Sequence, residues 1–560
     1  MWFLPKYKLT QKNKLKAIAT FSYISYLVIL LTIHFFSKKF SVVNGDTSIF
    51  IEYFWRINHG QVPHVDFYSP FGPFIYYLYY QFIFVANLFN PNNILEHTNI
   101  LNFLDIFKVT ITFFVITYLF FLERFFPLKT KSNTIFLIIS VFISSFFITP
   151  RAYGYDYIIA LTSFYNMIIE GSIILTIYTF FRASLYLMGE KPKKKFSHGI
   201  IFLILGAINF QLIFLKVTAL ILAFPILFIP FISKNQALKQ LTNLYVIGLF
   251  IGLLFCFFIF GHNLLLSYFF DVITTIKIRL DSSLIVTSLY ERLPSIFLNV
   301  ARDLFSLTLI FFVTEFAKNR DKLHKRRYSV YIFFYLIIFL ISFSLQLFSE
   351  QYPESNLASF MMIICFFVVF TSNLKPSYKG TLSLLFLAFP LWTIFKNILY
   401  PLLIITFSFF PNQNQSLNFL DHVVIKDLSI TESIKNSLDY SQVSAKKKIF
   451  KLDDESIYRI IQKLEVLDID KSVSSFMCNF PAAYIFDSEP PKNTNLYWHY
   501  GVTFGDSHNI FRNDDKTSVF IICNYYPGLY QQLNIKDFFE EIYVSDSVRV
   551  LVRKEKTIFH

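Results

Sequence analysis

Long apolar segments recur along residues 1–410 and are separated by short polar or basic tracts. A helix needs about 20 mainly apolar residues to cross a bilayer, and about eleven segments approach this length. They lie near 17–36, 100–122, 134–150, 157–181, 199–215, 217–232, 243–260, 296–316, 330–348, 357–372 and 380–397. The pattern predicts a polytopic α-helical membrane protein with about 10–12 spans.

One apolar segment, 74–89, is shorter than an ordinary span and rich in Tyr. Tyrosine is enriched where a membrane meets water, so we interpret this segment as an interfacial helix on the outer leaflet. A short true span is the alternative. It would move the basic tract at 123–131 to the outer side of the membrane.

Positive charge is distributed in a way that predicts topology. The chain has a net charge of +14, carried mainly in tracts between the apolar segments. The tracts lie at 123–131, 191–195, 233–239, 318–327 and 375–379. Basic loops stay in the cytoplasm, which places the N-terminus inside and 37–99, 151–156, Lys216, 261–294 and 351–354 outside. No continuous basic face is evident, so we expect no nucleic-acid partner.

Apolar residues make up 54% of the whole chain, and most of them precede Pro411, after which the composition becomes polar. We therefore divide the chain into a transmembrane domain, 1–410, and an exported soluble α/β domain, 411–560. A helical pattern around 457–464 precedes strand-like runs at 518–523 and 548–552. Cys478 and Cys523 either form a disulfide in an oxidising compartment or remain buried thiols.

The outer loop at 37–99 contains several polar and turn-forming elements in a specific order. Asn44-Gly45-Asp46 follows the first span, then Asp66, then Pro70-Phe71-Gly72-Pro73 ahead of the Tyr-rich segment. Asp46 lies close to the membrane surface, where its carboxylate can meet a lipid-borne substrate. As an alternative, Asp46 caps a helix that begins at Thr47.

This loop resembles the first periplasmic loop of the GT-C membrane glycosyltransferases, which include bacterial lipid A aminoarabinose transferases and protein mannosyltransferases. The resemblance implies a GT-C-like fold, a polyprenyl-phosphate-linked sugar donor and an acceptor in the cell envelope, whether lipopolysaccharide or another lipid, glycan or protein. It also implies that Asp46 is the general base. We assign Asp66, in the same loop, to substrate binding.

Two further elements resemble parts of the family's site. Arg151 and Asp156 stand in the second outer loop, where the arginine would bind a phosphate and the aspartate would position sugar or acceptor. The alternative is that Arg151 and Asp156 pair with each other at the interface. Lys216 interrupts a long apolar stretch, and binding the donor's phosphate would account for a charge at that depth. Snorkelling to the membrane surface is the alternative.

A late outer loop carries Tyr352-Pro353-Glu354, similar to a Tyr-Pro element of the family. Tyr352 and Glu354 are expected to hydrogen-bond sugar hydroxyls, although Pro353 also has a plain role in breaking the chain before a helix. We expect no obligatory metal or other cofactor, because His64, His262 and Glu52 show no ligand spacing. A divalent metal at these residues stays the alternative.

Together these features predict a glycosyltransferase at the outer face of a membrane, which by resemblance would be a bacterial inner membrane with the C-terminal domain in the periplasm. A transporter or flippase for lipid-linked saccharides is the first alternative. The acidic candidates gather in outer loops, whereas transport sites lie near the bilayer midplane. A non-catalytic assembly protein is the second alternative, and it should tolerate Asp46→Asn.

Overall fold

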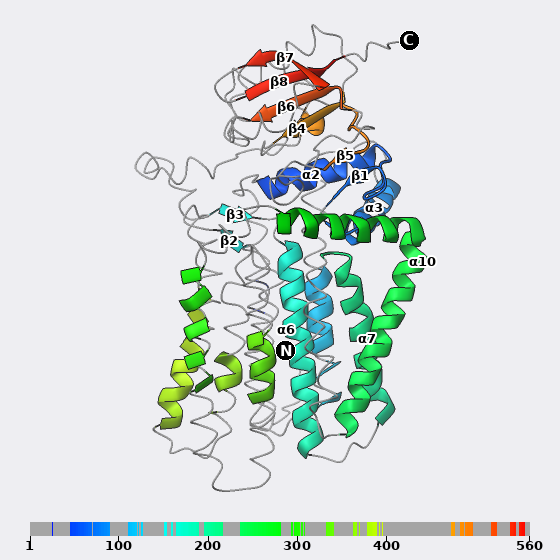
Figure 1. Cartoon of the computed structure of the whole chain (residues 1–560). Helices are drawn as coiled ribbons and strands as arrows, with labels where there is room; N and C mark the ends of the chain where they lie inside the picture. Colours follow the sequence, from blue (N-terminus) through cyan, green and yellow to red (C-terminus); the bar gives the residue numbers. More distant parts are fainter. Residues whose placement is uncertain are drawn as a thin grey trace, which may run out of the picture.

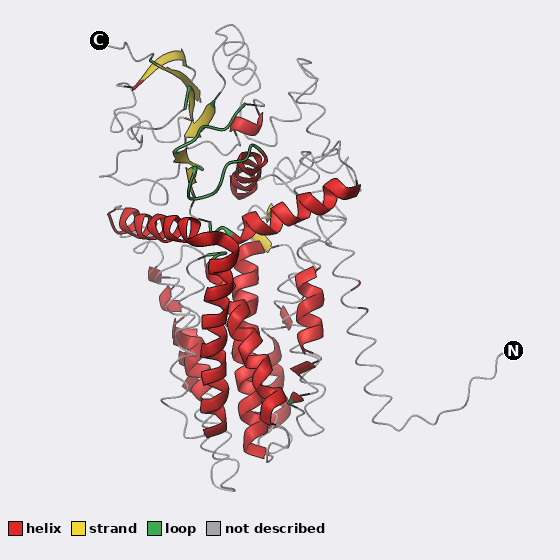
Figure 2. Cartoon of the chain, turned by 90° about the vertical axis from the view of Figure 1, so that its right-hand side faces the viewer, coloured by secondary structure: helices red, strands yellow, loops and turns green. Residues whose placement is uncertain are grey.

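The computed structural model describes the outer loop, part of the helical domain and part of the C-terminal domain. The described residues are mainly 45–69, 71–89, 110–119, 151–153, 158–160, 164–189, 195–216 and 236–281, with shorter pieces between 293 and 395 and between 472 and 554. Figure 1 and Figure 2 show, from two sides, upright helices at the bottom, helices lying across their upper ends, and a sheet above these helices.

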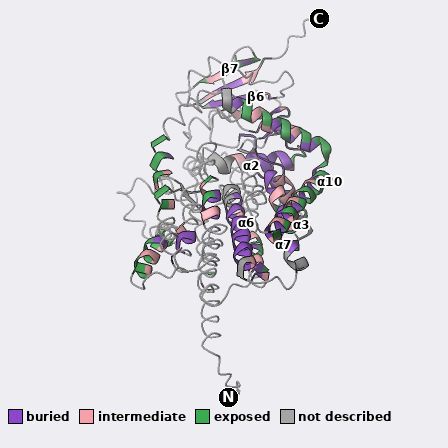
Figure 3. Cartoon of the chain, turned by 60° about the horizontal axis from the view of Figure 1, so that its bottom comes forward, coloured by how far each residue is buried: buried purple, intermediate pink, exposed green. Residues whose placement is uncertain are grey.

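Three long helices form the best described part of the bundle: α6 (Phe164–Gly189), α7 (Lys195–Ile213) and the first part of α10 (Gln236–Asp281). The amide of Asn209 on α7 joins them, because it donates to the Thr176 hydroxyl at 2.8 Å and the Tyr245 hydroxyl at 3.0 Å. Polar side chains in apolar helices often hold neighbouring helices together in this way. Figure 3 shows α6 largely buried, whereas α10 presents a long exposed face.

Close packing of α7 against α10 depends on small residues. A Cβ added at Gly206 would lie 2.1 Å from the Tyr245 carbonyl oxygen, and one at Gly248 would lie 2.1 Å from the Leu203 carbonyl oxygen. Gly248 and Gly252 are spaced as in a small-xxx-small motif, which lets two helix backbones approach closely. This packing role of the glycines was not among the features predicted from the sequence.

Helix α10 changes direction at Gly261, whose backbone has φ 72° and ψ 162°. Glycine adopts this conformation readily, whereas a side chain would strain it. The second part of α10 then runs across the upper ends of α6 and α7 (Figure 1). Among the described residues, 236–278 is the one helix long and apolar enough to cross a membrane, and three shorter apolar helices lie at 110–119, 171–187 and 199–213.

The described helices agree only partly with the predicted spans. Helix α6 begins at Phe164 and not near 157, because Ile158–Ala160 forms β3, which pairs antiparallel with β2 (Arg151–Tyr153). Helix α3 (Phe74–Phe89) coincides with the short Tyr-rich segment. The predicted spans 134–150 and 217–232 lie outside the described residues. The number of spans therefore stays a prediction.

The C-terminal domain contains a four-stranded mixed sheet with the order β4-β6-β8-β7. Its strands are β4 (Val473–Phe476), β6 (Val519–Cys523), β7 (Phe539–Val544) and β8 (Val548–Arg553). Strand β6 pairs parallel with β4 and antiparallel with β8, and Phe520 and Ile521, on its opposite faces, are fully buried. Strands β6 and β8 coincide with the strand-like runs in the sequence. The expected helix at 457–464 and Cys478 lie outside the described residues.

Candidate functional site

Helix α2 (Gly45–Asn58) carries the candidate base. Asp46 is its second residue, so the helix starts slightly before the expected Thr47. A carboxylate in the first turn of a helix is favoured by the positive end of the helix dipole. The helix is anchored by its other end, where Tyr53, Phe54 and Ile57 are buried in the main core. Phe54 stacks on Tyr79 of α3, with ring centroids 3.8 Å apart.

The loop after α2 is stiffened by its own hydrogen bonds. The Asp66 carboxylate accepts from the Val62 N–H at 2.7 Å, and the Asp66 N–H donates to the Val62 carbonyl at 2.8 Å. Within this turn His64 adopts φ 67°, an uncommon conformation for a residue with a side chain. Asp66 therefore braces the loop and remains partly exposed. Its proposed contact with substrate stays a prediction.

The first outer loop lies directly against the turn that contains Lys216. The Gly72 N–H donates to the Leu215 carbonyl at 3.3 Å, and the Phe74 N–H donates to the Phe214 carbonyl at 3.0 Å. A Cβ at Gly72 would lie 1.8 Å from the Phe214 carbonyl oxygen, so only glycine fits this approach. Lys216 ends the turn at the upper end of α7 and is partly exposed. Two motifs selected separately from the sequence thus adjoin in the structure.

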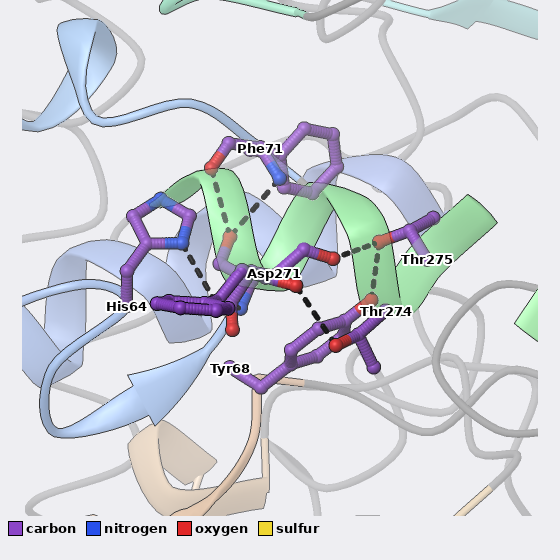
Figure 4. Close-up of polar contacts among 8 residues, drawn as sticks. His64, Tyr68, Phe71, Asp271, Thr274 and Thr275 are labelled. Carbon is purple, nitrogen blue, oxygen red and sulfur yellow. Dashed lines mark hydrogen bonds and ion pairs between the residues drawn. The ribbon is translucent and has the colours of Figure 1, made fainter. Parts of the chain in front are cut away.

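The second part of α10 holds the same loop from another direction. His64 Nδ1 lies 2.8 Å from Asp271 Oδ2, and both side chains are at least 90% buried. The Tyr68 hydroxyl hydrogen-bonds the Thr275 hydroxyl one turn further along α10, as Figure 4 shows. From the sequence, His64 was a candidate only as a metal ligand, and Asp271 was not among the predicted site residues. The pair lies 207 positions apart, so no local spacing could have shown it.

A segment of the C-terminal domain completes the surroundings of α2. Strand β1 (Phe67–Tyr68) of the loop pairs parallel with β5 (Thr494–Asn495). Just before β5, the backbone carbonyls of Ser488, Pro490 and Pro491 accept hydrogen bonds from side chains of α2 and the following turn. In Figure 1, α2 has its C-terminal end at β1 and β5 and its N-terminal end on the side where the β2–β3 hairpin lies.

Burial controls the ionisation of the tyrosines around α2. Desolvation raises the pKa of Tyr53 well above its ordinary value, and the nearby Tyr76 and Tyr77 raise it further. Its hydroxyl has no hydrogen-bond partner in the part of the chain that the structure describes. Desolvation likewise raises the pKa of Tyr79 to about 12. These phenols stay neutral at physiological pH, so they provide packing without charge.

The remaining predicted site residues are placed less fully. Arg151 begins β2, on the hairpin that follows the first outer loop in the chain. Asp156, Tyr352 and Glu354 lie outside the described residues. In the described ranges, no three His, Cys, Asp or Glu side chains form a group that could hold a metal ion. Glu52 instead lies 3.4 Å from Arg56, and His64 contacts Asp271.

No family model matches this chain, and no curated protein matches its sequence. A search of solved structures found a likeness to the archaeal oligosaccharyltransferase AglB from Archaeoglobus fulgidus, in complex with an inhibitory peptide and a dolichol-phosphate. The alignment covers 96% of this chain and 75% of that chain, with 12% identity and a TM-score of 0.40. At this TM-score the likeness assigns neither a family nor an activity to this chain.

Proposed function

We propose that this protein is a membrane glycosyltransferase that moves a sugar from a polyprenyl-phosphate donor to a cell-envelope acceptor at the outer face of the membrane. One observation carries the proposal: the loop that follows the Asp46 helix is hydrogen-bonded to the turn that ends in Lys216. The sequence assigns proton transfer to Asp46 and phosphate binding to Lys216, and these hydrogen bonds connect the segments that carry the two residues.

The proposed chemistry needs one base and one cation. Asp46 takes the proton of the acceptor's nucleophilic group as that group forms a bond to the anomeric carbon of the sugar. The bond between this carbon and the phosphate oxygen breaks, and the polyprenyl phosphate leaves with the electron pair. Lys216 offsets the charge that develops on the phosphate, and Arg151 is the second candidate for this role. Loss of one well-placed charge-stabilising donor typically costs about 2.7–4 kcal/mol of barrier.

The other assigned residues would select and orient the substrates. Asp66 and Asp156 are proposed to position sugar or acceptor, and Tyr352 and Glu354 to hydrogen-bond sugar hydroxyls. The bilayer would present the lipid-linked donor along the exposed apolar helices. We propose a bacterial inner membrane as the location, with a cytoplasmic N-terminus and a periplasmic C-terminal domain. We propose no role for a metal ion in this reaction.

The test is sugar transfer from a defined set of polyprenyl-phosphate sugars to membrane extracts by purified protein. Wild type is compared with Asp46→Asn and Lys216→Met at equal folded yield. Lys277→Met is the matched control, because Lys277 is exposed on the second part of α10. We expect both site variants to lose roughly 100- to 1000-fold in rate and the control to keep its rate.

Each outcome decides a different part of the proposal. Transfer that is unchanged in Asp46→Asn would exclude Asp46 as the base. Transfer that is unchanged in Lys216→Met would move phosphate binding to another cation, with Arg151 as the first candidate. If wild type transfers nothing but moves labelled donor across the membrane of a sealed liposome, the flippase alternative replaces the transferase.

A further inference from the structure

We infer that the C-terminal domain positions the helix that carries Asp46, and that Arg56 is the positioning residue. The structural part of this inference stands alone, and its catalytic consequence rests on the proposed function. The contact consists of Trp55, Arg56 and Gln61 together with the segment 488–491, and we call it the α2 clamp.

Three side-chain donors meet three backbone acceptors in the α2 clamp. Trp55 Nε1 donates to the Ser488 carbonyl at 3.0 Å and Arg56 Nη1 to the Pro491 carbonyl at 2.8 Å. Gln61 Nε2 donates to the Pro490 carbonyl at 2.5 Å. Proline lacks an N–H, so a proline-containing segment cannot form a complete two-sided strand ladder. Its buried carbonyls still need donors, and α2 and its turn supply them.

Arg56 makes the clamp specific because its side chain is almost completely buried, with 1% exposed. It lies 3.4 Å from the Glu52 carboxylate, and its carbon Cζ lies 5.1 Å from the centre of the Phe67 ring. A buried charge is costly unless ion pairing and hydrogen bonds compensate for it. The Pro491 carbonyl is part of that compensation, so the C-terminal domain contributes to the stability of α2.

The clamp and the candidate base lie at opposite ends of one helix. Ten residues separate Asp46 from Arg56, which corresponds to about 15 Å along a helix axis. Because a short helix moves as a rigid body, displacement at Arg56 changes the position of Asp46. Misplacement of about 1 Å can cost on the order of 100-fold in rate. The C-terminal domain therefore acts on the site through α2 without contributing a reacting group.

The same domain meets the loop twice more. Beyond the clamp, the Asn493 N–H donates to the Asp66 carbonyl at 2.6 Å, and the Leu496 N–H donates to the Tyr68 carbonyl at 2.9 Å. These two hydrogen bonds join backbone atoms only, although Asn493 adopts φ 59°, a conformation that few residues with a side chain adopt. The clamp is the part of the contact that substitution can weaken selectively.

The experiment uses the full chain in lipid nanodiscs and two conservative variants. Arg56→Lys keeps the charge but loses the planar fork of donors, and Trp55→Phe keeps an aromatic side chain but loses the indole N–H and part of the ring volume. Arg549→Lys is the control, because Arg549 forms a partly exposed pair with Glu541 within the sheet at 3.2 Å, away from α2. Hydrogen exchange is followed for peptides covering 45–58 and 488–496, and transfer is measured separately.

We expect amide exchange in 45–58 to rise roughly tenfold in both variants, as fits the loss of one hydrogen bond, and to stay unchanged in the control. We also expect kcat to fall while KM for the donor is unchanged, because Lys216 is untouched. Faster exchange in 488–496 with unchanged exchange in 45–58 would overturn the inference, since the clamp would then only hold the C-terminal domain down. If wild type has no transferase activity, the exchange data still decide the structural part, so the two failures are distinguishable.

Discussion

The junction between the outer loop and the Lys216 turn gives the sharpest prediction, through Gly72→Ala. The added Cβ would lie 1.8 Å from the carbonyl oxygen and 2.2 Å from the carbonyl carbon of Phe214. Both atoms belong to the backbone at the end of α7, so neither can move away as a flexible side chain would. The loop or the turn must therefore shift.

The cost follows from what the shift breaks. Two backbone hydrogen bonds cross this junction, from Gly72 to Leu215 and from Phe74 to Phe214. Each contributes about 0.5–1.5 kcal/mol net, and overpacking of a close contact costs about 1–3 kcal/mol. We expect Gly72→Ala to destabilise the protein by about 2–6 kcal/mol. We also expect it to reduce transfer, because Asp46 and Lys216 lose their common support.

Gly380→Ala is the matched control. Gly380 is helical, and a Cβ there meets nothing within 4 Å. Alanine in a helix is favoured over glycine by about 0.5–1 kcal/mol, so this variant should be slightly more stable than wild type. Apparent Tm is compared in one detergent at one scan rate, since irreversible unfolding makes Tm depend on scan rate. An apparent Tm for Gly72→Ala equal to that of Gly380→Ala, with wild-type transfer, would refute the reasoning.

Three further predictions concern the packing around this junction. Burial raises the pKa of Tyr53, so the neutral phenol stabilises the folded protein below the ordinary pKa of 10.0, and this stability is lost as pH rises above that value. Wild type should therefore lose more apparent Tm between about pH 8 and about pH 11 than Tyr53→Phe does. An equal loss in wild type and variant would contradict this prediction. Asp271→Ala removes the partner of buried His64 and should lower the free energy of unfolding by about 1–3 kcal/mol, measured as a lower apparent Tm. If the variant is as stable as wild type, the pair contributes nothing to stability. Gly248→Leu should separate α7 from α10 and greatly reduce the yield of folded protein, whereas Ile247→Leu, on the exposed face, should leave it unchanged.

Much of the local structure could be predicted from the sequence, because it depends on neighbouring residues. The apolar pattern indicated helices where α3, α7 and the first part of α10 lie, and alternating or β-branched runs indicated β6 and β8. The pattern was less accurate at the start of α6, where an apolar run near 157 forms a strand. Apolar content alone does not distinguish a short buried strand from the beginning of a helix.

For the candidate site, too, local features could be predicted from the sequence and long-range contacts could not. Asp46, Asp66 and Lys216 could be selected from the sequence, because a carboxylate in a turn-rich loop and a lone cation in an apolar stretch are local signals. Their assembly could not be predicted in this way. The hydrogen bond between Gly72 and Leu215 depends on where α7 ends and on the path by which the outer loop returns to that end. The spacing of glycines in the sequence specifies neither.

The sequence by itself determined where α3, α7, the first part of α10 and the strands β6 and β8 lie, whereas the roles of Asp46, Asp66 and Lys216 stay predictions. Only the tertiary structure showed that His64 meets Asp271 across 207 positions and that Arg56 meets Pro491 across 435. The physical reason is range: helix and strand patterns arise from residues a few positions apart. Partners of buried charges are instead selected by packing of distant segments, which leaves no periodic pattern in the chain.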